Sequence, residues 1–475
     1  MNYSQFLQMM PEATLTAILI ITFVCDFCSY GKTNRRWFNP LVCLLMLAHL
    51  LINVMPVSEV FVFGGMYHTY PAAGVMKTIL AAGTLIVLIQ SRTWLSRPDT
   101  EFKEGEFYMI LISTLLGMNM MVSAGHFLMF FLGLEMTSVP MACLVAFDKY
   151  RKNSAEAGAK FILSAIFSSS VMLYGICLLY SAVGTLYFDD VAQKLSVTPL
   201  TITGLVFFFS GLGFKMSLVP FHFWTADTYQ GAPTTVTGYL SVVSKGSAAF
   251  TLSVILMKVF SAMVDVWEPL LYIIVVASIT LANIMAIRQK ELKRFMAFSS
   301  ISQAGYIILA VIGNTGLSLS ALTFYVLVYV VANLAVFTII SIVEQRNGGT
   351  TMISSYDGFY TTNPRLALLM TFSLFSLAGI PPFAGMFSKF FVFMAALKAG
   401  SVGAYVVVFI ALINTVVSLY YYLLIVKAMY IKTSDHALPT FRSDFNTRLA
   451  LFICIAGVLF CGVVSCFWEW IDAAI

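Results

Sequence analysis

Four lysines lie inside long apolar stretches of the chain, where charged side chains are rare: Lys160, Lys215, Lys245 and Lys389. A charge at the centre of a membrane-spanning helix costs at least about 2.5 to 3.5 kcal/mol. Burial favours the neutral amine, whereas a nearby carboxylate favours the ammonium. A buried lysine beside a carboxylate can therefore take up and release a proton. A fifth lysine, Lys77, lies near the start of its apolar stretch.

One acid, Glu135 in FLGLEMTSVP, is placed as deeply as the lysines. It lies about nine residues into its segment, or roughly 14 Å at 1.5 Å per residue, which makes it a natural partner for one lysine. Lys160 has an alternative, because it lies only about one and a half turns inside its segment. It can extend to the membrane surface or pair with Glu156, four residues earlier.

Prolines interrupt two of the lysine-bearing segments. Lys215 precedes Pro220 in GLGFKMSLVPFHFW, and Lys389 follows the double proline in LAGIPPFAGMFSKF. Proline has no amide hydrogen, so it leaves the carbonyl four residues earlier without its helical partner. At membrane depth such carbonyls need protein or water as partners.

These carbonyls are predicted to belong to Met216, Leu377 and Ala378. Broken helices in matching positions of two halves are typical of transporters with an ion path near the membrane midplane. The alternative is that the prolines only kink packed helices. His222, beyond Pro220, titrates closest to neutral pH and suits a relay between lysines, although it can equally be a hydrogen-bonded core residue.

The elements that carry these residues are membrane helices. Of the 475 residues, 60% are hydrophobic and only 10% are charged, whereas soluble domains carry about 25% charged residues. Apolar stretches of the length that crosses a bilayer, about 20 residues, recur along the chain. The sequence therefore predicts an all-α polytopic membrane protein of about fourteen helices. These are expected near residues 13–30, 39–55, 71–91, 106–123, 126–147, 156–181, 199–229, 233–258, 268–287, 294–313, 316–343, 364–399, 401–431 and 447–468.

Basic residues concentrate in alternate loops, for example at Arg35, Arg92, Arg151 and Arg288. By the positive-inside rule these loops face the cytoplasm, so both termini are expected on the outer side. Topology accounts for the net charge of +5, and no nucleic-acid partner is needed to explain it.

Motifs for redox or nucleotide chemistry are absent from the sequence. It has no GxGxxG after a strand, no GxxxxGK[ST], and no cysteine cluster with iron-sulfur or zinc spacing among its 8 cysteines. We therefore expect no metal and no cofactor on this chain, and any redox or ATP-driven step must occur on another chain.

The stretch FKMSLVPFHFWTADTYQGAPTTV, residues 214–236, closely resembles the most diagnostic segment of the antiporter-like subunits of respiratory complex I, and its FHxWTxDxYxGAP form resembles the N type. GLEMTSVP around Glu135, ELKRFMAFSSISQAGY at 291–306 and SLAGIPPFAGMFSKF at 376–390 agree in order. The resemblance spans nearly the whole chain.

The resemblance implies a proton path. Glu135 on the fifth helix pairs with Lys160 on the sixth, and this pair shifts the proton affinity of Lys215 on the broken seventh helix. His222 and Lys245 continue the path along the midplane, and Lys389 on the broken twelfth helix passes the proton to the outer side. The catalytic set is thus Glu135, Lys160, Lys215, His222, Lys245 and Lys389.

Two positions depart from the family pattern. Gln303 stands where a histidine is common, and Ala226 replaces a proline. Glutamine does not titrate at physiological pH, so the relay at Gln303 is expected to use water.

The resemblance also implies two inverted five-helix repeats, helices 4 to 8 and helices 9 to 13, with helices 7 and 12 discontinuous. The expected divisions are residues 1–104, 105–260, 266–432 and 445–475. The neighbours are expected to be M-type or L-type and K-type subunits in a bacterial inner membrane, with both termini periplasmic. NADH, FMN, iron-sulfur clusters and quinone belong to other subunits of such a complex.

Three interpretations compete. The first is a proton-translocating subunit driven by quinone reduction elsewhere in the complex. The second is a subunit of a multisubunit cation/proton antiporter or of a membrane-bound hydrogenase. The third is a structural membrane subunit whose buried charges only hold helices together, in which case neutralising Lys215 damages assembly rather than pumping.

Overall fold

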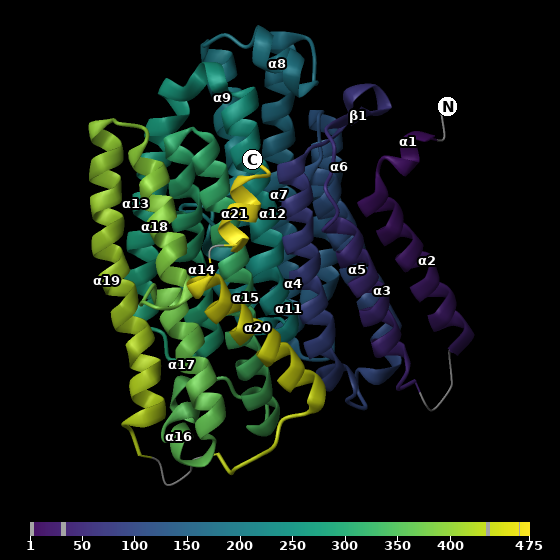
Figure 1. The fold of residues 1–475 in the computed structure, drawn as a ribbon, viewed down its shortest axis with the longest axis vertical. Coiled ribbons are helices and arrows are strands. Elements are labelled where there is room, and N and C mark those ends of the chain that lie inside the picture. The colour runs from purple at the N-terminus through teal and green to yellow at the C-terminus, as the bar shows by residue number, and fades with distance from the viewer. Residues whose placement is uncertain (1–3, 30–34, 434–437, 465) are drawn as a thin grey trace.

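The structure is a computed structural model that describes residues 4–29, 35–433, 438–464 and 466–475. Within these ranges the chain is a bundle of helices with one small two-stranded sheet. The long helices run roughly along the longest axis of the molecule (Figure 1). The all-α membrane fold predicted from the sequence is confirmed.

The helices and strands of the described residues are, in chain order, α1 (Ser4–Leu7), α2 (Met10–Ser29), α3 (Phe38–Asn53), β1 (Val60–Val62), β2 (Tyr67–Thr69), α4 (Pro71–Leu95), α5 (Glu104–Val122), α6 (Phe127–Val145), α7 (Lys152–Val183), α8 (Phe188–Lys194), α9 (Pro199–Met216), α10 (Phe223–Gly231), α11 (Thr234–Tyr239), α12 (Lys245–Val254), α13 (Val264–Ile287), α14 (Leu292–Leu309), α15 (Gly316–Arg346), α16 (Phe359–Thr362), α17 (Pro364–Ala378), α18 (Ala384–Leu397), α19 (Val402–Tyr430), α20 (Phe445–Val463) and α21 (Cys466–Asp472).

Within the described ranges, 12 helices are long and apolar enough to cross a membrane. The shorter apolar helix α3 supplies one further crossing, and α17 with α18 supplies another. Fourteen crossings result, as the sequence predicts. An even number returns the chain to the side on which it started, and the first and last described helices, α1 and α21, both lie in the upper half of Figure 1.

The seventh crossing is interrupted beside Pro220. Helix α9 ends at Met216, Ser217 adopts a left-handed conformation with φ 64°, and α10 begins at Phe223. The indole Nε1 of Trp224 donates to the carbonyl oxygen of Phe214 at 3.1 Å, which ties the second half of the helix to the first. The break is therefore a loop of several residues rather than a kink.

The twelfth crossing is interrupted at the double proline. Helix α17 ends at Ala378, Gly379 adopts φ 89°, and α18 begins at Ala384. An L side chain is strained at such a positive φ, which is why glycine suits this position. Both helices predicted to be discontinuous are thus broken, and each is the fourth of five successive crossings.

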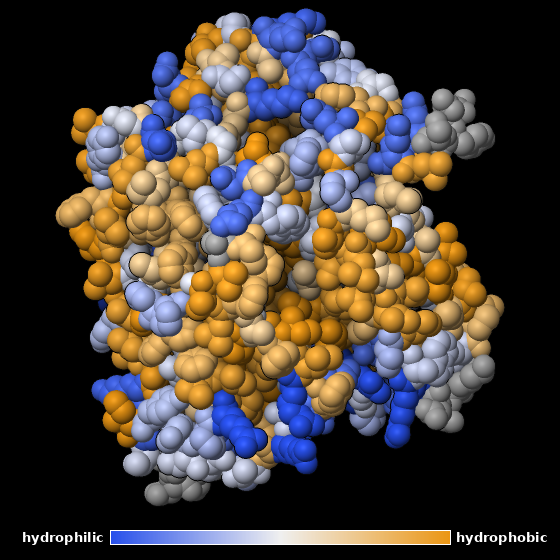
Figure 2. All heavy atoms as spheres, viewed as in Figure 1, coloured by the Kyte–Doolittle hydropathy of each residue, from blue (hydrophilic) through white to orange (hydrophobic). Residues whose placement is uncertain are grey.

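The surface is apolar where the helices face outward. Large apolar side chains point out of the bundle along its length, among them Phe27, Phe167 and Phe409. Figure 2 shows a broad orange band of hydrophobic residues, with hydrophilic residues concentrated toward the two ends of the molecule. An apolar belt of this extent fits a hydrocarbon solvent rather than water.

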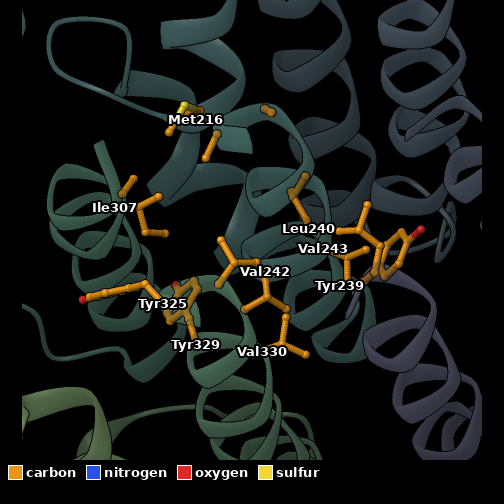
Figure 3. Packing of buried hydrophobic residues seen from close by; sticks show 14 of the residues in the cluster. Met216, Tyr239, Leu240, Val242, Val243, Ile307, Tyr325, Tyr329 and Val330 are labelled. Carbon is orange, nitrogen blue, oxygen red and sulfur yellow. The ribbon is translucent and has the colours of Figure 1, made fainter. Parts of the chain in front are cut away.

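The interior of the bundle is formed by α4, α11, α12, α14 and α15, which other helices surround. Figure 3 shows Val242 and Val243 beside Val330 of α15, with Tyr325 and Tyr329 close by. Gly83 of α4 permits this close packing, because a Cβ there would lie 2.9 Å from a Val243 methyl group. Lys245 and Gln303 thus belong to the most enclosed helices.

A π-helical turn, Leu240–Ser244, joins α11 to α12 directly before Lys245. Such turns are rare in proteins, but those that occur are often found at functional sites. They alter the direction of the side chains that follow. The turn sets the rotation at which Lys245 leaves the helix.

Candidate functional site

Lys215 is buried at the end of α9, directly before the break. Its Nζ donates to the Thr137 hydroxyl at 2.7 Å and to the Ser138 hydroxyl at 2.9 Å. Only 4% of the residue is exposed. Both hydroxyls belong to α6, so a neighbouring helix supplies the polar environment of the amine.

Glu135 lies on α6, two residues before Thr137, so it belongs to the same helix as both hydrogen-bond partners of Lys215. Its Oε1 is buried and has no hydrogen-bond partner among the described residues. A buried carboxylate oxygen needs a partner or loses its solvation free energy. Glu135 is therefore placed to favour the ammonium form of Lys215.

The predicted salt bridge between Glu135 and Lys160 is wrong. The Nζ of Lys160 lies 2.8 Å from a Glu156 oxygen and 2.7 Å from Asp227 Oδ2, and its side chain is 45% exposed. Lys160 enters the bundle only about two turns beyond the start of α7, so its long side chain reaches the surface. The surface pairing with Glu156, left open from the sequence, is the one that forms.

Asp227 of α10 is a functional candidate that sequence reasoning missed. Its second oxygen, Oδ1, lies 2.6 Å from Arg294 Nη1 of α14, so the carboxylate bridges Lys160 and Arg294. It thereby links the broken seventh helix to a helix of the second half. The motif WTADTY contained the signal, because its aspartate recurs in the pattern that carries the resemblance.

Two polar cavities lie at the end of the bundle where Asp227 pairs with Lys160. One, of about 300 Å³, is lined by Glu156, Lys160, Asp227 and Arg294. The other, of about 340 Å³, lies beside it and is lined by charged residues that include Asp148. Asp148 is in the loop between α6 and α7, and burial raises the pKa of its carboxyl. Water can therefore approach the second half of the broken helix from this end.

Lys245 is buried at the centre of the bundle. Its Nζ donates to the Ser300 hydroxyl of α14 at 2.7 Å and lies 5.4 Å from the centre of the Tyr229 ring. The hydroxyls of Tyr229 and Ser300 are 3.1 Å apart. Lys245 and Tyr229 of the first half of the chain thus contact Ser300 of the second half.

Gln303 lies one turn beyond Ser299 on α14 and joins groups from three helices. Its Nε2 lies 3.2 Å from the Tyr422 hydroxyl and 3.3 Å from the carbonyl oxygen of Leu377, while the Tyr325 hydroxyl donates to its Oε1. The hydroxyl of Tyr422 also lies 2.5 Å from that of Ser299. The amide is a fixed connector, since it does not titrate.

Lys389 is buried in α18, on the far side of the second break. Its Nζ donates to the carbonyl oxygen of Ala378 at 2.9 Å and lies 4.9 Å from the Tyr306 ring centre. Both Leu377 and Ala378 carbonyls thus find side-chain partners, as predicted from the double proline. The buried amine of Lys389 thus donates a hydrogen bond to the Ala378 carbonyl oxygen, which has lost its helical amide partner at the proline.

His222 occupies the position before α10, makes no capping hydrogen bond with its side chain, and is half-buried. Its ring packs on Phe223 with centroids 4.5 Å apart, and its Nδ1 is buried without a hydrogen-bond partner among the described residues. No hydrogen bond in the described ranges joins His222 to Lys215 or Lys245. The predicted relay through His222 is not made by direct contact.

Between Lys215 and Lys245 in the sequence, several buried hydroxyls have no hydrogen-bond partner in the described part of the chain: Ser217, Thr225, Thr228 and Ser244. Buried polar groups normally have a protein or water partner. No hydrogen bond among the described residues joins Lys215 directly to Lys245. These hydroxyls offer acceptors and donors beside each lysine.

Lys77 of α4 forms a buried ion pair that the sequence did not predict. It lies near the start of α4, as expected, but it is only 1% exposed. Its Nζ lies 2.6 Å from Glu12 Oε1 and 2.9 Å from the Tyr67 hydroxyl. The partner comes from α2, and the sequence separation of the two helices hid the pair.

A row of polar groups connects two lysine amines, which are the members of the row that can bind and release a proton near neutral pH. From Lys245 the row runs through Ser300 and Ser299, then Tyr422 and Gln303, to the carbonyls of Leu377 and Ala378 and finally Lys389. The steps between Ser300 and Ser299 and between Leu377 and Ala378 are between neighbours in the chain. No cluster of metal-ligating residues occurs among the described residues.

Comparisons with known proteins agree with this geometry. The family described as NADH:quinone oxidoreductase/Mrp antiporter, TM matches residues 124–418. NADH-quinone oxidoreductase subunit N of Phocaeicola vulgatus is 58% identical over 98% of both chains. Subunit N of Azobacteroides pseudotrichonymphae is 47% identical over 99% of this chain and 98% of the relative.

Solved structures match over nearly the whole chain. A chain of respiratory complex I from Thermus thermophilus is 29% identical with a TM-score of 0.78, covering 95% of this chain and 97% of that one. A chain of the Mrp complex from Dietzia sp. has a TM-score of 0.84 at 19% identity, covering 98% and 96%, and is similar in fold. The chain belongs to the transmembrane NADH:quinone oxidoreductase/Mrp antiporter family and, within it, to the antiporter-like N subunits of complex I.

Proposed function

We propose that this chain translocates protons across the membrane as the N subunit of an NADH:quinone oxidoreductase, through its midplane row of lysines, hydroxyls and Gln303. The row of polar groups from Lys245 to Lys389 carries the proposal. Polar groups at membrane depth are costly and cluster along ion and proton pathways. A purely structural role would be served by apolar packing at lower cost.

Glu135, Lys215 and the α6 hydroxyls form the loading site of this path. The carboxylate favours the ammonium form of Lys215, and Thr137 and Ser138 accept its hydrogen bonds. A shift of α6 relative to α9 weakens both effects and releases the proton. The hydroxyls of Ser217 and Ser244, which lack partners among the described residues, carry the proton on to Lys245 together with water. His222 contributes through water rather than by direct contact with either lysine.

Asp227 lies where protons enter. The carboxylate lines a polar cavity at the end of the bundle and is held between Lys160 and Arg294. Lys160 then acts at the entrance through Asp227 and not as the partner of Glu135. Lys389 delivers the proton toward the opposite side.

The membrane is the bacterial inner membrane, with the basic loops in the cytoplasm and both termini in the periplasm. An odd number of crossings in each repeat makes the second repeat enter from the opposite side, so residues 105–260 and 266–432 form the inverted pair. The two breaks then lie in equivalent positions.

Energy for pumping comes from other chains. NADH oxidation and quinone reduction, with FMN and iron-sulfur clusters, belong to neighbouring subunits, and this chain acts as a translocase without a redox centre. Its membrane neighbours are an M-type or L-type subunit on one face and a K-type subunit on another.

The test compares two lysines of one helical segment. Lys245→Met removes the buried amine, whereas Lys258→Met removes an exposed amine whose Nζ lies 2.7 Å from Asp189. In membrane vesicles that carry the assembled complex, NADH-driven proton pumping should fall about a hundredfold in the first variant and remain in the second. Equal pumping by the two variants would reject the path through Lys245.

A further inference from the structure

An open groove at one end of the bundle combines an arginine rim with an apolar slot. It lies between α17, residues 438–444 and α20, and encloses about 810 Å³. Its polar end holds Arg365, Arg442 and Arg448, and its apolar part includes Leu369, Phe452 and Leu459. On the face drawn in Figure 2, hydrophilic residues at the lower edge give way to a hydrophobic band above.

The three arginines are exposed and have no carboxylate within 4 Å among the described residues. The acid next to the rim in sequence, Asp444, lines a separate cavity with Arg97 and Arg346. Asn363, which also lines the groove, already donates to the carbonyl oxygen of Pro439. Within the described ranges, the rim therefore carries three arginines without an ion-pair partner.

The apolar part of the groove has the depth of one lipid leaflet. Along α20, Leu459 lies about 17 Å beyond the rim residue Arg448 at 1.5 Å per residue. Half of a hydrocarbon core is about 15 Å. The rim thus lies near the membrane–water boundary while the slot extends to the middle of the bilayer.

We propose that this groove binds a phospholipid with an anionic headgroup, its phosphate on the three arginines and one acyl chain in the slot beside α20. Arginine binds phosphate through a fork of hydrogen bonds, and basic pockets between membrane helices bind anionic headgroups. A ligand with one anionic end and one apolar tail matches the separation of charge and apolar surface. The inference is independent of the proton path.

Two variants test the two halves of the groove. R365Q/R442Q/R448Q removes the charged rim, and Ala456→Trp fills the slot while leaving the charge unchanged. The matched controls are R36Q/R288Q/K290Q, which removes three exposed charges elsewhere, and Ile453→Trp, an exposed position of α20 outside the groove lining. Assembly of the intact complex is measured on every preparation.

The purified, delipidated complex is titrated with phosphatidylglycerol or phosphatidylcholine, and bound lipid is counted by native mass spectrometry. The wild-type complex and both controls should each bind one phosphatidylglycerol. Neither phosphatidylcholine nor inorganic phosphate should displace this bound lipid. At about fivefold in affinity for each arginine, the triple variant should bind it on the order of a hundredfold more weakly, and Ala456→Trp should lose it.

Three outcomes would overturn the proposal. Equal phosphatidylglycerol binding by the triple variant and its control would remove the role of the rim. Displacement by inorganic phosphate would reduce the site to a simple anion site. Cross-linking of Phe452→Cys to a neighbouring subunit in the intact complex would show that a protein subunit, and not a lipid, occupies the groove.

Discussion

The two broken helices hold their lysines in different ways. Lys215 lies before its break, and its amine is satisfied by hydroxyls of another helix, α6. Lys389 lies after its break, and its amine is satisfied by the Ala378 carbonyl at the end of the preceding half-helix. A lysine near a proline break therefore occurs in two environments: side-chain hydroxyls surround the amine of Lys215, and a backbone carbonyl binds the amine of Lys389.

The difference assigns different roles to the two lysines. The partners of Lys215 can move relative to it because they belong to a separate helix that also carries Glu135. The partner of Lys389 is a backbone carbonyl on the other side of the break. Neither amine has a carboxylate within 4 Å among the described residues, but the helix that holds the partners of Lys215 also carries Glu135. Lys215 is suited to switching its proton affinity, and Lys389 to passing a proton on.

Among the four changes that compare the surroundings of the two broken helices, the largest effect is expected at Lys389. Lys389→Ala removes the amine that ends the polar row, and pumping should fall about a hundredfold, as for loss of a positioned proton-transfer group. Lys398→Ala, at the exposed end of the same helix, is the matched control. Proton pumping and NADH oxidation in vesicles measure both variants, and normal pumping by Lys389→Ala would contradict its place in the path.

The environment of Lys215 is tested by removing one of the two α6 hydroxyls. In Thr137→Val the ammonium loses one of its two hydrogen bonds, and a bond to a charged group contributes about 1.5 to 3 kcal/mol, of which the lower value corresponds to about tenfold. Pumping should fall roughly tenfold at neutral pH, because the charged form of Lys215 becomes harder to populate. Ser113→Ala, whose hydroxyl bonds only within its own helix α5, should pump normally. Equal loss in the control would point to a general packing defect.

A smaller effect is expected at Gln303, which connects the two environments. Gln303→Leu deletes the bonds to Tyr422 and to the carbonyl oxygen of Leu377. At the lower value of about 0.5 kcal/mol for each of these two hydrogen bonds, a decrease of about fivefold in pumping is expected. Gln303→His keeps a donor and should retain most of the activity. Full activity of the leucine variant would show that the row does not pass through Gln303.

The smallest effect is expected at the entrance. Lys160 and Asp227 form a partly exposed pair, and exposed pairs contribute little and weaken with salt. A double-mutant cycle of Lys160→Met and Asp227→Asn, read as pumping rate at low and high salt, should show coupling that salt removes. Coupling between Lys160 and Glu135 in place of this pair would restore the original prediction.

Much of the fold follows from the sequence because the bilayer imposes segment length and excludes unpaired backbone. The crossings, both proline breaks and the depth of Lys215, Lys245 and Lys389 follow from these rules. The need of the Leu377 and Ala378 carbonyls for new partners also follows, because it depends only on the missing amide hydrogens of proline.

The side-chain partners did not follow from the sequence. The partner of Lys160 depends on how far α7 lies from α6 and on a carboxylate that is 67 residues away on α10. Likewise, the pairing of Lys77 with Glu12 joins helices whose contact no sequence period encodes. The bridging of Gln303 to α17 and α19 depends on the packing of the second repeat.

The most direct test of the account is proton pumping by the assembled complex that carries Lys215→Ala, with NADH oxidation and assembly measured on the same vesicles. The account predicts an assembled complex that has lost pumping. Unchanged pumping would contradict the place of Lys215 at the centre of the path, and loss of assembly would favour a structural role for the buried charge.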